Sequence, residues 1–413
     1  MHGFLLFVLI WLAVGTIAIG WTGRRTLAGL WREPVLMHPV LIVESDDWGA
    51  GPPEQAEQLT RIAAVLASHV NRTGQKPVMT LGVVLGVADG ARILAGGLRQ
   101  YHRRSLGQAE FASTFAAIKR GVEMGVFALQ LHGEEHYWPP ALLVAARDGP
   151  SVKGWLSGSD VPRTETLPAA LQSRWIDATE LPSKPLRSHE IRAVALAEAA
   201  SFLRIFGKAP KVAVPPTFIW NDIVEAAWGE AGVEFVVTPG RRYVARDANG
   251  DPVPEGPPIV NGDRGAAGIT YLVRDDYFEP ARGHQAERGL AALVAKTRTG
   301  RPTLLETHRA NFLDDSATAG AAIRELERLL VLSLRAFPDV VFLSTQELGS
   351  QMRRGDPRLI ERRLSARIHI WLRRLWGLSR LRKLAFLTGV IVPAWLLYLL
   401  TWRRTGAPRS ASG

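Results

Sequence analysis

The stretch Val40-Leu41-Ile42-Val43-Glu44-Ser45-Asp46-Asp47-Trp48-Gly49 begins as a short apolar run and ends in two adjacent carboxylates. A short apolar run followed by polar and turn residues is typical of a strand that is buried in a parallel sheet. In barrel enzymes, functional residues gather at the C-terminal ends of such strands. We therefore expect Asp46 and Asp47 to lie at a functional edge of the sheet.

Outward from this stretch, short β-branched or apolar runs alternate with longer helical patterns. That alternation is typical of βα units and a parallel sheet, so we expect an α/β fold, a deformed (β/α)7-type barrel over residues 34–350. Residues 139–188 and 238–268 are dense in Pro and Gly and are expected to be long loops. The expected strands lie near residues 40–44, 78–83, 126–131, 211–214, 234–237, 270–273, 303–306 and 340–344.

A second polar cluster, His132-Gly133-Glu134-Glu135-His136, follows the third expected strand. One carboxylate and two imidazoles suit a divalent ion such as zinc, and three protein ligands leave one position for water. Taken separately, an Asp-Asp pair is usually a turn or a helix cap, and two histidines four apart are usually a surface feature of a helix. Their joint placement at strand ends instead favours a metal site and metal-assisted hydrolysis.

These motifs resemble those of the polysaccharide deacetylases of the carbohydrate esterase type. The resemblance covers roughly residues 39–346 and implies a deformed barrel of about seven βα units. It also implies that Asp46 is the general base and that Asp47, His132 and His136 hold the metal, most often zinc. Here Gly133 stands where the family has a hydroxyl residue.

Two further motifs match the family less closely. The stretch Ala213-Val214-Pro215-Pro216-Thr217 corresponds loosely to its third motif but lacks the arginine that positions the base. Leu305-Glu306-Thr307-His308 is similar to the late motif that supplies a histidine acid, which implies that His308 protonates the leaving group. We expect Arg274, which ends a strand, or Arg309, which follows His308, to substitute for the missing arginine.

A few other side chains are candidates for substrate contact. Trp48 and Trp138 flank the two motifs and are candidates for stacking on a sugar ring, with core packing as the alternative. Pro215 and Asn311 are expected to line the pocket. Glu134 and Glu135 either support the histidines or are solvated loop carboxylates.

The formal net charge of +11 over 413 residues first suggests that the protein binds nucleic acid. The charge is uneven, however, because residues 351–413 carry 14 Lys or Arg against 2 Asp or Glu, and residues 1–33 carry 3 against 1. The remainder is 11 − 12 − 2 = −3, so a basic surface that tracks phosphates over the folded domain is not expected. The chain contains no cysteine, which excludes disulfides and thiolate chemistry.

Two uncharged runs, residues 3–21 and 384–402, have the length of transmembrane helices. A cleaved signal peptide is the alternative for the first run. Residues 358–383 form an expected basic amphipathic helix that lies on the membrane surface or packs on the soluble domain. Arginines after the first run, and eight basic residues at 362–383 against three after the second, predict a cytoplasmic central domain with both termini outside.

Together these features predict a membrane-anchored, metal-dependent hydrolase that removes an N- or O-acyl group, normally acetyl, from a sugar. Its expected partners are the membrane and an acylated saccharide, which is linked to a polyprenyl carrier if the domain is cytoplasmic. One alternative is a catalytically degenerate barrel that binds glycan as a scaffold in polysaccharide assembly. Phosphodiester hydrolysis is another, because an activated water does not by itself choose between acyl and phosphoryl groups.

Overall fold

A curled parallel sheet forms the centre of the computed structural model, which describes residues 2–158, 160–313 and 316–405. The strand order is β12-β9-β8-β5-β2-β1-β14-β13, with β15 paired to β1, and the neighbouring strands in this sheet are parallel. All eight expected strands are present. With β13, which was not expected, the strands of the sheet are β1 (Val40–Gly49), β2 (Met79–Val84), β5 (Phe127–Leu131), β8 (Val212–Ala213), β9 (Phe235–Thr238), β12 (Thr270–Val273), β13 (Asp276–Tyr277), β14 (Thr303–His308) and β15 (Val341–Phe342).

The sheet curls into a half-barrel with a seam, which is consistent with the deformed barrel expected from the sequence. Its two edges are β12 and β13, and no ladder joins them within the described residues. Only Arg274 and Asp275 separate these strands along the chain, whereas a parallel pair needs a crossover of a dozen or more residues. The fold is therefore an α/β curled sheet with a seam, and Arg274 lies in that seam.

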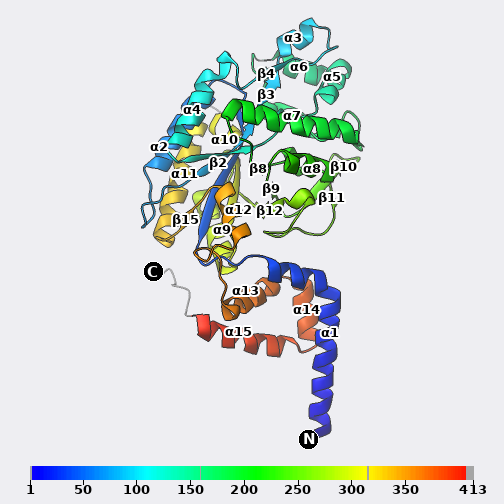
Figure 1. Ribbon diagram of the computed structural model, residues 1–413, viewed down its shortest axis with the longest axis vertical. Helices are drawn as coiled ribbons and strands as arrows, with labels where there is room; N and C mark the ends of the chain where they lie inside the picture. The colour runs from blue at the N-terminus through cyan, green and yellow to red at the C-terminus, as the bar shows by residue number, and fades with distance from the viewer. Residues whose placement is uncertain (1, 159, 314–315, 406–413) are drawn as a thin grey trace.

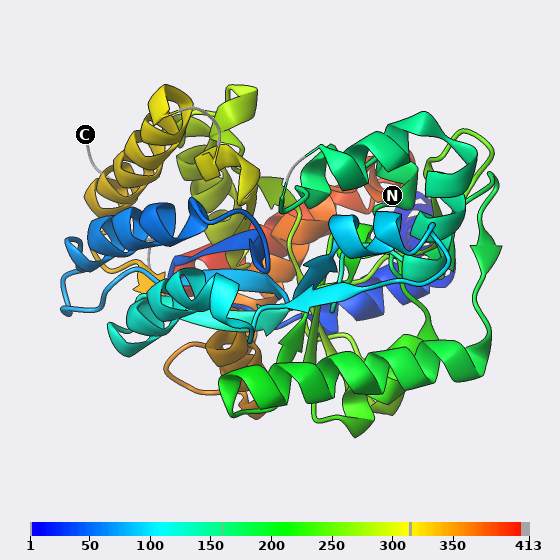
Figure 2. The same cartoon turned by 90° about the horizontal axis from the view of Figure 1, so that it is seen from above.

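Helices surround the sheet, as Figure 2 shows from above. In α2, the buried residues Leu59, Ile62, Ala63 and Leu66 recur at spacings of three and four, so one stripe of the helix faces the core. Six helices lie between the strands, where the sequence shows longer helical patterns. They are α2 (Gln55–Ala67), α4 (Ala112–Glu123), α7 (Ser188–Phe206), α8 (Asp222–Glu230), α9 (Ala286–Arg298) and α11 (Ser316–Ala336).

The two stretches expected to be long loops contain regular structure instead. Residues 139–188 include α5 (Pro139–Asp148), α6 (Pro150–Ser157) and a short hairpin, because a proline in the first turn of a helix starts the helix without cost. Residues 238–268 include the antiparallel pair β10 (Arg242–Arg246) and β11 (Pro252–Glu255).

A separate unit of helices lies below the sheet in Figure 1. It contains α1 (His2–Arg32), which is long and apolar enough to cross a membrane. The expected second span, residues 384–402, is not one continuous helix: α14 (Ser379–Leu387) and α15 (Ile391–Thr405) meet at an angle of 113°. Gly389 at the bend has φ +75°, and Pro393 lacks the N–H that a helix interior needs, so a new helix starts there.

The basic helix expected at residues 358–383 is also shorter and differently placed. It begins at Leu364 as α13 (Leu364–Trp376), because Ile360 is buried and pairs with Leu36 in a β-bridge. Its Arg374 is buried and donates hydrogen bonds to the carbonyls of Pro34 and Gly300 at the base of the sheet. The helix therefore packs on the soluble domain, the alternative interpretation of this segment.

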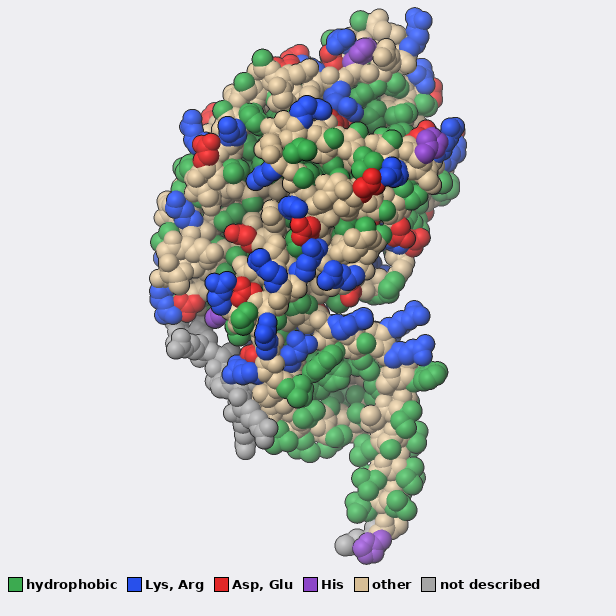
Figure 3. Space-filling model, viewed as in Figure 1, with side chains coloured by type: hydrophobic (Ala, Val, Ile, Leu, Met, Phe, Trp, Pro, Cys, Tyr) green, Lys and Arg blue, Asp and Glu red, His purple; other side chains and the backbone are tan. Residues whose placement is uncertain are grey.

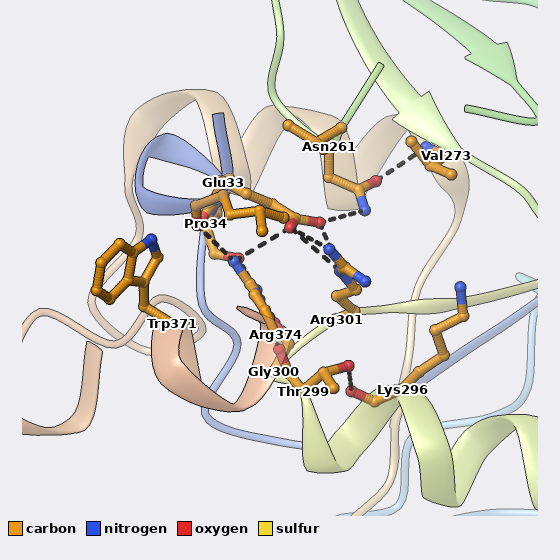
Figure 4. Close-up of polar contacts among 12 residues, drawn as sticks. Glu33, Pro34, Asn261, Val273, Lys296, Thr299, Gly300, Arg301, Trp371 and Arg374 are labelled. Carbon is orange, nitrogen blue, oxygen red and sulfur yellow. Dashed lines mark hydrogen bonds and ion pairs between the residues drawn. The ribbon is translucent and has the colours of Figure 1, made fainter. Parts of the chain in front are cut away.

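Figure 4 shows the contacts that join the helical unit to the sheet. The buried carboxylate of Glu33 accepts hydrogen bonds from Arg301, at 2.7 to 3.1 Å, and is 3.2 Å from Arg374. Glu33 precedes β1 and Arg301 precedes β14, so this junction lies at the N-terminal ends of the strands. The seven residue-to-residue steps from Val40 to Asp47 span about 23 Å of strand, so the end of β1 faces away from the helical unit.

Candidate metal centre

The end of β1 is irregular at the Asp-Asp pair. The register between β1 and β2 shifts between Ser45 and Trp48, and Asp47 has φ +74°, a conformation that costs energy for any residue with a side chain. Successive side chains of a regular strand point to opposite faces of the sheet. The bulge therefore explains how both Asp46 and Asp47 reach the interior.

Asp47, His132 and His136 come together in a buried cluster whose ligand atoms lie within 4.8 Å of one another. Asp47 Oδ1 is 3.4 Å from His132 Nε2 and 3.6 Å from His136 Nε2, and it is buried without a hydrogen-bond partner. Ligand atoms 2.0–2.1 Å from one tetrahedral zinc are about 3.4 Å apart. These three residues therefore fit a divalent ion, which would also satisfy the orphaned oxygen.

A backbone carbonyl holds the first histidine in the orientation that a ligand needs. His132 Nδ1 is 2.9 Å from the carbonyl oxygen of Val214, which follows β8, so Nε2 faces Asp47. Such a contact fixes the tautomer and the ring of a metal-binding histidine. The loosely matching third motif thus contributes to the site through its backbone.

The segment that carries both histidines is an irregular loop and not the helical turn that the four-residue spacing suggests. Gly133 has φ +97°, and a Cβ on it would lie 2.8 Å from the carbonyl oxygen of Glu135, which explains the departure from the family's hydroxyl residue. Glu134 and Glu135 are buried, so they are not solvated loop carboxylates. The buried guanidinium of Arg174 contacts Glu135 at 2.7 Å and Glu198 at 2.8 Å and so links the loop to α7.

Asp46 lies against an arginine from the seam of the sheet. Arg274 donates to Asp46 Oδ2 at 2.6 Å and to Glu44 Oε2 at 2.8 Å, and its Nε is 3.2 Å from Glu306 Oε2. Burial raises the pKa of Asp46, but the contact with Arg274 and the nearby rings of His132 and His308 together outweigh it and lower the pKa. The guanidinium of Arg309 instead contacts Glu165 at 2.6 Å, and Arg309 meets Asp46 only through its backbone N–H, which donates to the Asp46 carbonyl oxygen at 2.9 Å. Of the two expected arginines, Arg274 is therefore the one whose side chain pairs with the Asp46 carboxylate.

His308 stands at the end of β14 with an acidic partner that the sequence did not reveal. Its Nδ1 is 2.6 Å from Glu279, and its Nε2 is 3.6 Å from Glu306. Burial lowers the pKa of His308, but the hydrogen bond to Glu279 and the charges of Asp47 and Glu306 outweigh it and raise the pKa to about 10. A cation held by Asp47 would offset part of that effect.

The remaining candidates do not face an open site in the way expected. Trp48 is fully buried and donates to Ser45 Oγ at 2.8 Å, so it packs in the core and is wrong as a sugar platform. Asn311 is also buried and donates to Glu279, which makes it a support for His308 and not a pocket residue. Pro215 is buried as well, whereas Trp138 is half-buried against a small apolar cluster.

Some participants in this site could have been found from the sequence and others could not. Glu44 and Glu306 interrupt otherwise apolar strands and pair in register, and an ionisable residue inside a buried strand is itself a signal of a polar interior. Glu279 and Arg174 lie outside the strands in segments without a motif, so no sequence pattern marks them.

No family model matches the chain, and no curated protein matches its sequence. Solved structures similar to it include the family 4 carbohydrate esterase from Streptomyces lividans, with 11% identity and a TM-score of 0.31 over 72% of this chain and 89% of that one. Peptidoglycan deacetylase PdaC from Bacillus subtilis has 12% identity and a TM-score of 0.34 over 77% and 95%. The 4-alpha-glucanotransferase from Thermococcus litoralis has 8% identity and a TM-score of 0.40 over 76% and 41%. Because each superposition is loose, the function proposed below rests on the geometry of the site itself.

Proposed function

We propose that this chain is a metal-dependent hydrolase that removes an N- or O-acyl group, normally acetyl, from a sugar. The single observation that carries the proposal is the cluster of Asp47, His132 and His136 around an oxygen that is buried without a partner. Zinc is the ion that this ligand set favours. A divalent cation at this position supplies Lewis acidity, which favours deprotonation of water and polarises an acyl carbonyl.

The chain's own residues provide both proton transfers of such a hydrolysis. Asp46, kept ionised by Arg274, is the base that takes a proton from water. His308, kept protonated by Glu279, is the acid that gives a proton to the departing sugar nitrogen or oxygen. The missing third-motif arginine is the reason to consider a degenerate glycan-binding barrel, and the contact between Arg274 and Asp46 weakens that alternative.

Release of acetate from a panel of N- and O-acetylated sugars tests this function. The full chain should release acetate, a chelator should stop the release, and added zinc should restore it. Retained binding of the same sugars without any release, in protein that contains stoichiometric metal, would favour the scaffold alternative. Release of phosphate from sugar phosphodiesters but not of acetate would favour phosphodiester hydrolysis.

We also propose that α1 alone crosses the membrane and that α14 and α15 form a re-entrant pair. Tyr398 in α15 stacks on His369 of α13, with ring centroids 4.3 Å apart, and α13 packs on the base of the sheet. The chain thus returns to the side of the membrane on which the sheet lies, instead of crossing to the opposite side. The arginines after α1 still predict a cytoplasmic sheet, with the saccharide presented about 23 Å or more from the helical unit.

The absence of native cysteine makes this topology directly testable. Single cysteines at Ser68 on the sheet domain and at Ser410 beyond α15 should react with an impermeant maleimide from the same side of the membrane. A cysteine at Gly3 should react only from the other side. Reaction of Ser68→Cys and Ser410→Cys from opposite sides would instead support two spans.

A further inference from the structure

The helical unit contains a half-open cavity of about 690 Å³ between α1, α13, α14 and α15. Most of its lining is apolar, and the exceptions include two arginines, Arg373 and Arg382. Cavities of this size typically hold a small molecule or part of a larger one. The apolar residues that define it include Ile19, Leu27, Trp376, Ala385, Ala394 and Leu397.

The bend between α14 and α15 creates this cavity. Along α1, Gly15 and Gly23 leave room for α14, since a Cβ on Gly15 would lie 2.6 Å from Thr388 and one on Gly23 would lie 3.1 Å from Leu381. After the 113° turn, α15 runs back to α13, where Thr401 Oγ1 is 3.5 Å from His369 Nδ1. The cavity is therefore the space that the re-entrant pair leaves against α1.

The two arginines give the cavity a charged edge. Arg373 donates to the carbonyl oxygen of Arg298 at 3.1 Å and Arg382 to that of Trp376 at 3.2 Å, both neutral acceptors. No acidic residue is among those that line the cavity in the described chain. Figure 3 shows basic side chains gathered where the green helical unit meets the sheet domain. Two uncompensated positive charges beside an apolar space fit an occupant with an anionic head and an apolar chain.

The surroundings of the helical unit identify the source of that occupant. Large apolar side chains of α1 are exposed, among them Phe4 at 75%, Ile17 at 69% and Trp21 at 71%. An exposed apolar surface of this extent marks a site of contact with a membrane or another protein, and α1 is long and apolar enough to cross a membrane, with tryptophans of the kind that favour the headgroup level. We infer from this that the cavity fills from lipid.

We propose that the cavity binds an anionic phospholipid, with an acyl chain among α1, α14 and α15 and the phosphate at Arg373 and Arg382. The bound lipid fills the space behind the bend and so holds α14 and α15 against α1 and α13. Because the metal centre lies at the opposite ends of the strands, this lipid is not the substrate. The site is independent of the hydrolase activity proposed above.

Photolabelling of the full chain in nanodiscs tests the site. The probes are phosphatidylglycerol and phosphatidylcholine, each with a diazirine on one acyl chain, and mass spectrometry maps the labelled peptides. Phosphatidylglycerol should label the peptides of α14 and α15 at least about fivefold more than phosphatidylcholine does. Arg382→Gln should lower that labelling about fivefold, and Ala385→Trp, which fills the cavity, should nearly abolish it.

Two variants of the same helix serve as matched controls. Arg380→Gln removes an exposed charge and Leu387→Trp adds an exposed ring, neither residue lines the cavity, and both should leave the labelling unchanged. Equal labelling by the two lipids would overturn the proposal. So would labelling that persists in Arg382→Gln, because the probe would then report only the bulk bilayer. If Ala385→Trp fails to assemble, Arg382→Gln alone decides.

Discussion

His132→Ala is expected to release the bound metal and to lower acyl hydrolysis by on the order of 10³-fold or more. Among the described residues, His132 Nε2 is one of three donors grouped at the candidate metal position, and its Nδ1 is already committed to the carbonyl oxygen of Val214. Two remaining donors do not hold a catalytic ion tightly. The measurements are metal content by mass spectrometry and acetate release by the same preparation.

Asp46→Asn is the matched comparison for this experiment, because the two residues belong to different parts of the site. The amide keeps the shape of the side chain but takes no proton from water, so activity should fall by a similar factor while the metal content stays unchanged. His189→Ala, an exposed histidine without an assigned role, should change neither quantity. Metal retained in His132→Ala, or lost equally in Asp46→Asn, would contradict the assignment of ligand and base.

Arg274→Met is expected to be nearly as damaging, with hydrolysis reduced about 10²–10³-fold and the metal retained. Arg274 is the only cation among the described residues whose side chain pairs with the Asp46 carboxylate, and it also neutralises Glu44 and Glu306 inside the sheet. Removal of one partner of a buried ion pair costs about 3–5 kcal/mol of stability, so folding is checked by thermal unfolding of each variant.

The pH dependence separates the catalytic role of Arg274 from its structural role. A base is active only when ionised, so activity falls as pH falls through the pKa of Asp46, which Arg274 lowers. Without Arg274 that pKa rises, and the acidic limb of the profile should move to higher pH. Arg274→Lys should restore part of the rate and move the limb back, because the charge returns without the three-way contact.

Arg309→Met is the control for this prediction. The side chain of Arg309 is equally buried but pairs with Glu165, and the hydrogen bond from Arg309 to Asp46 comes from the backbone N–H, so loss of the guanidinium should leave the acidic limb in place. An Arg274→Met enzyme with an unshifted acidic limb would show that this arginine serves only the fold.

Much of the fold follows from patterns that the sequence displays directly. Apolar runs such as Val40–Val43 locate the strands, and spacings of three and four locate the helices. The position of the seam could not be predicted, because it depends on the two-residue link between β12 and β13. The bend within the second expected span could not be predicted from hydropathy, which measures length and composition, whereas Gly389 and Pro393 decide whether a run of apolar residues stays one helix.

For the candidate site, too, the sequence predicts some residues and misses others. Asp46, Asp47, His132, His136 and His308 were chosen because polar residues end apolar strands, and the structure brings them to one end of the sheet. Their partners depend on tertiary contacts between segments far apart in the sequence. Arg274 was one of two candidates because it ends a strand, but the choice between it and Arg309 depends on a side-chain contact with Asp46 across 228 residues, which no local pattern reveals.

The most direct test of the metal centre is an anomalous X-ray difference map of the full chain, recorded at the zinc edge. The geometry of the site predicts one peak within bonding distance of Asp47 Oδ1, His132 Nε2 and His136 Nε2. A map of zinc-loaded protein without a peak at these atoms would contradict it. A peak at the neighbouring group of Asp46, Glu306 and His308 instead would contradict it equally.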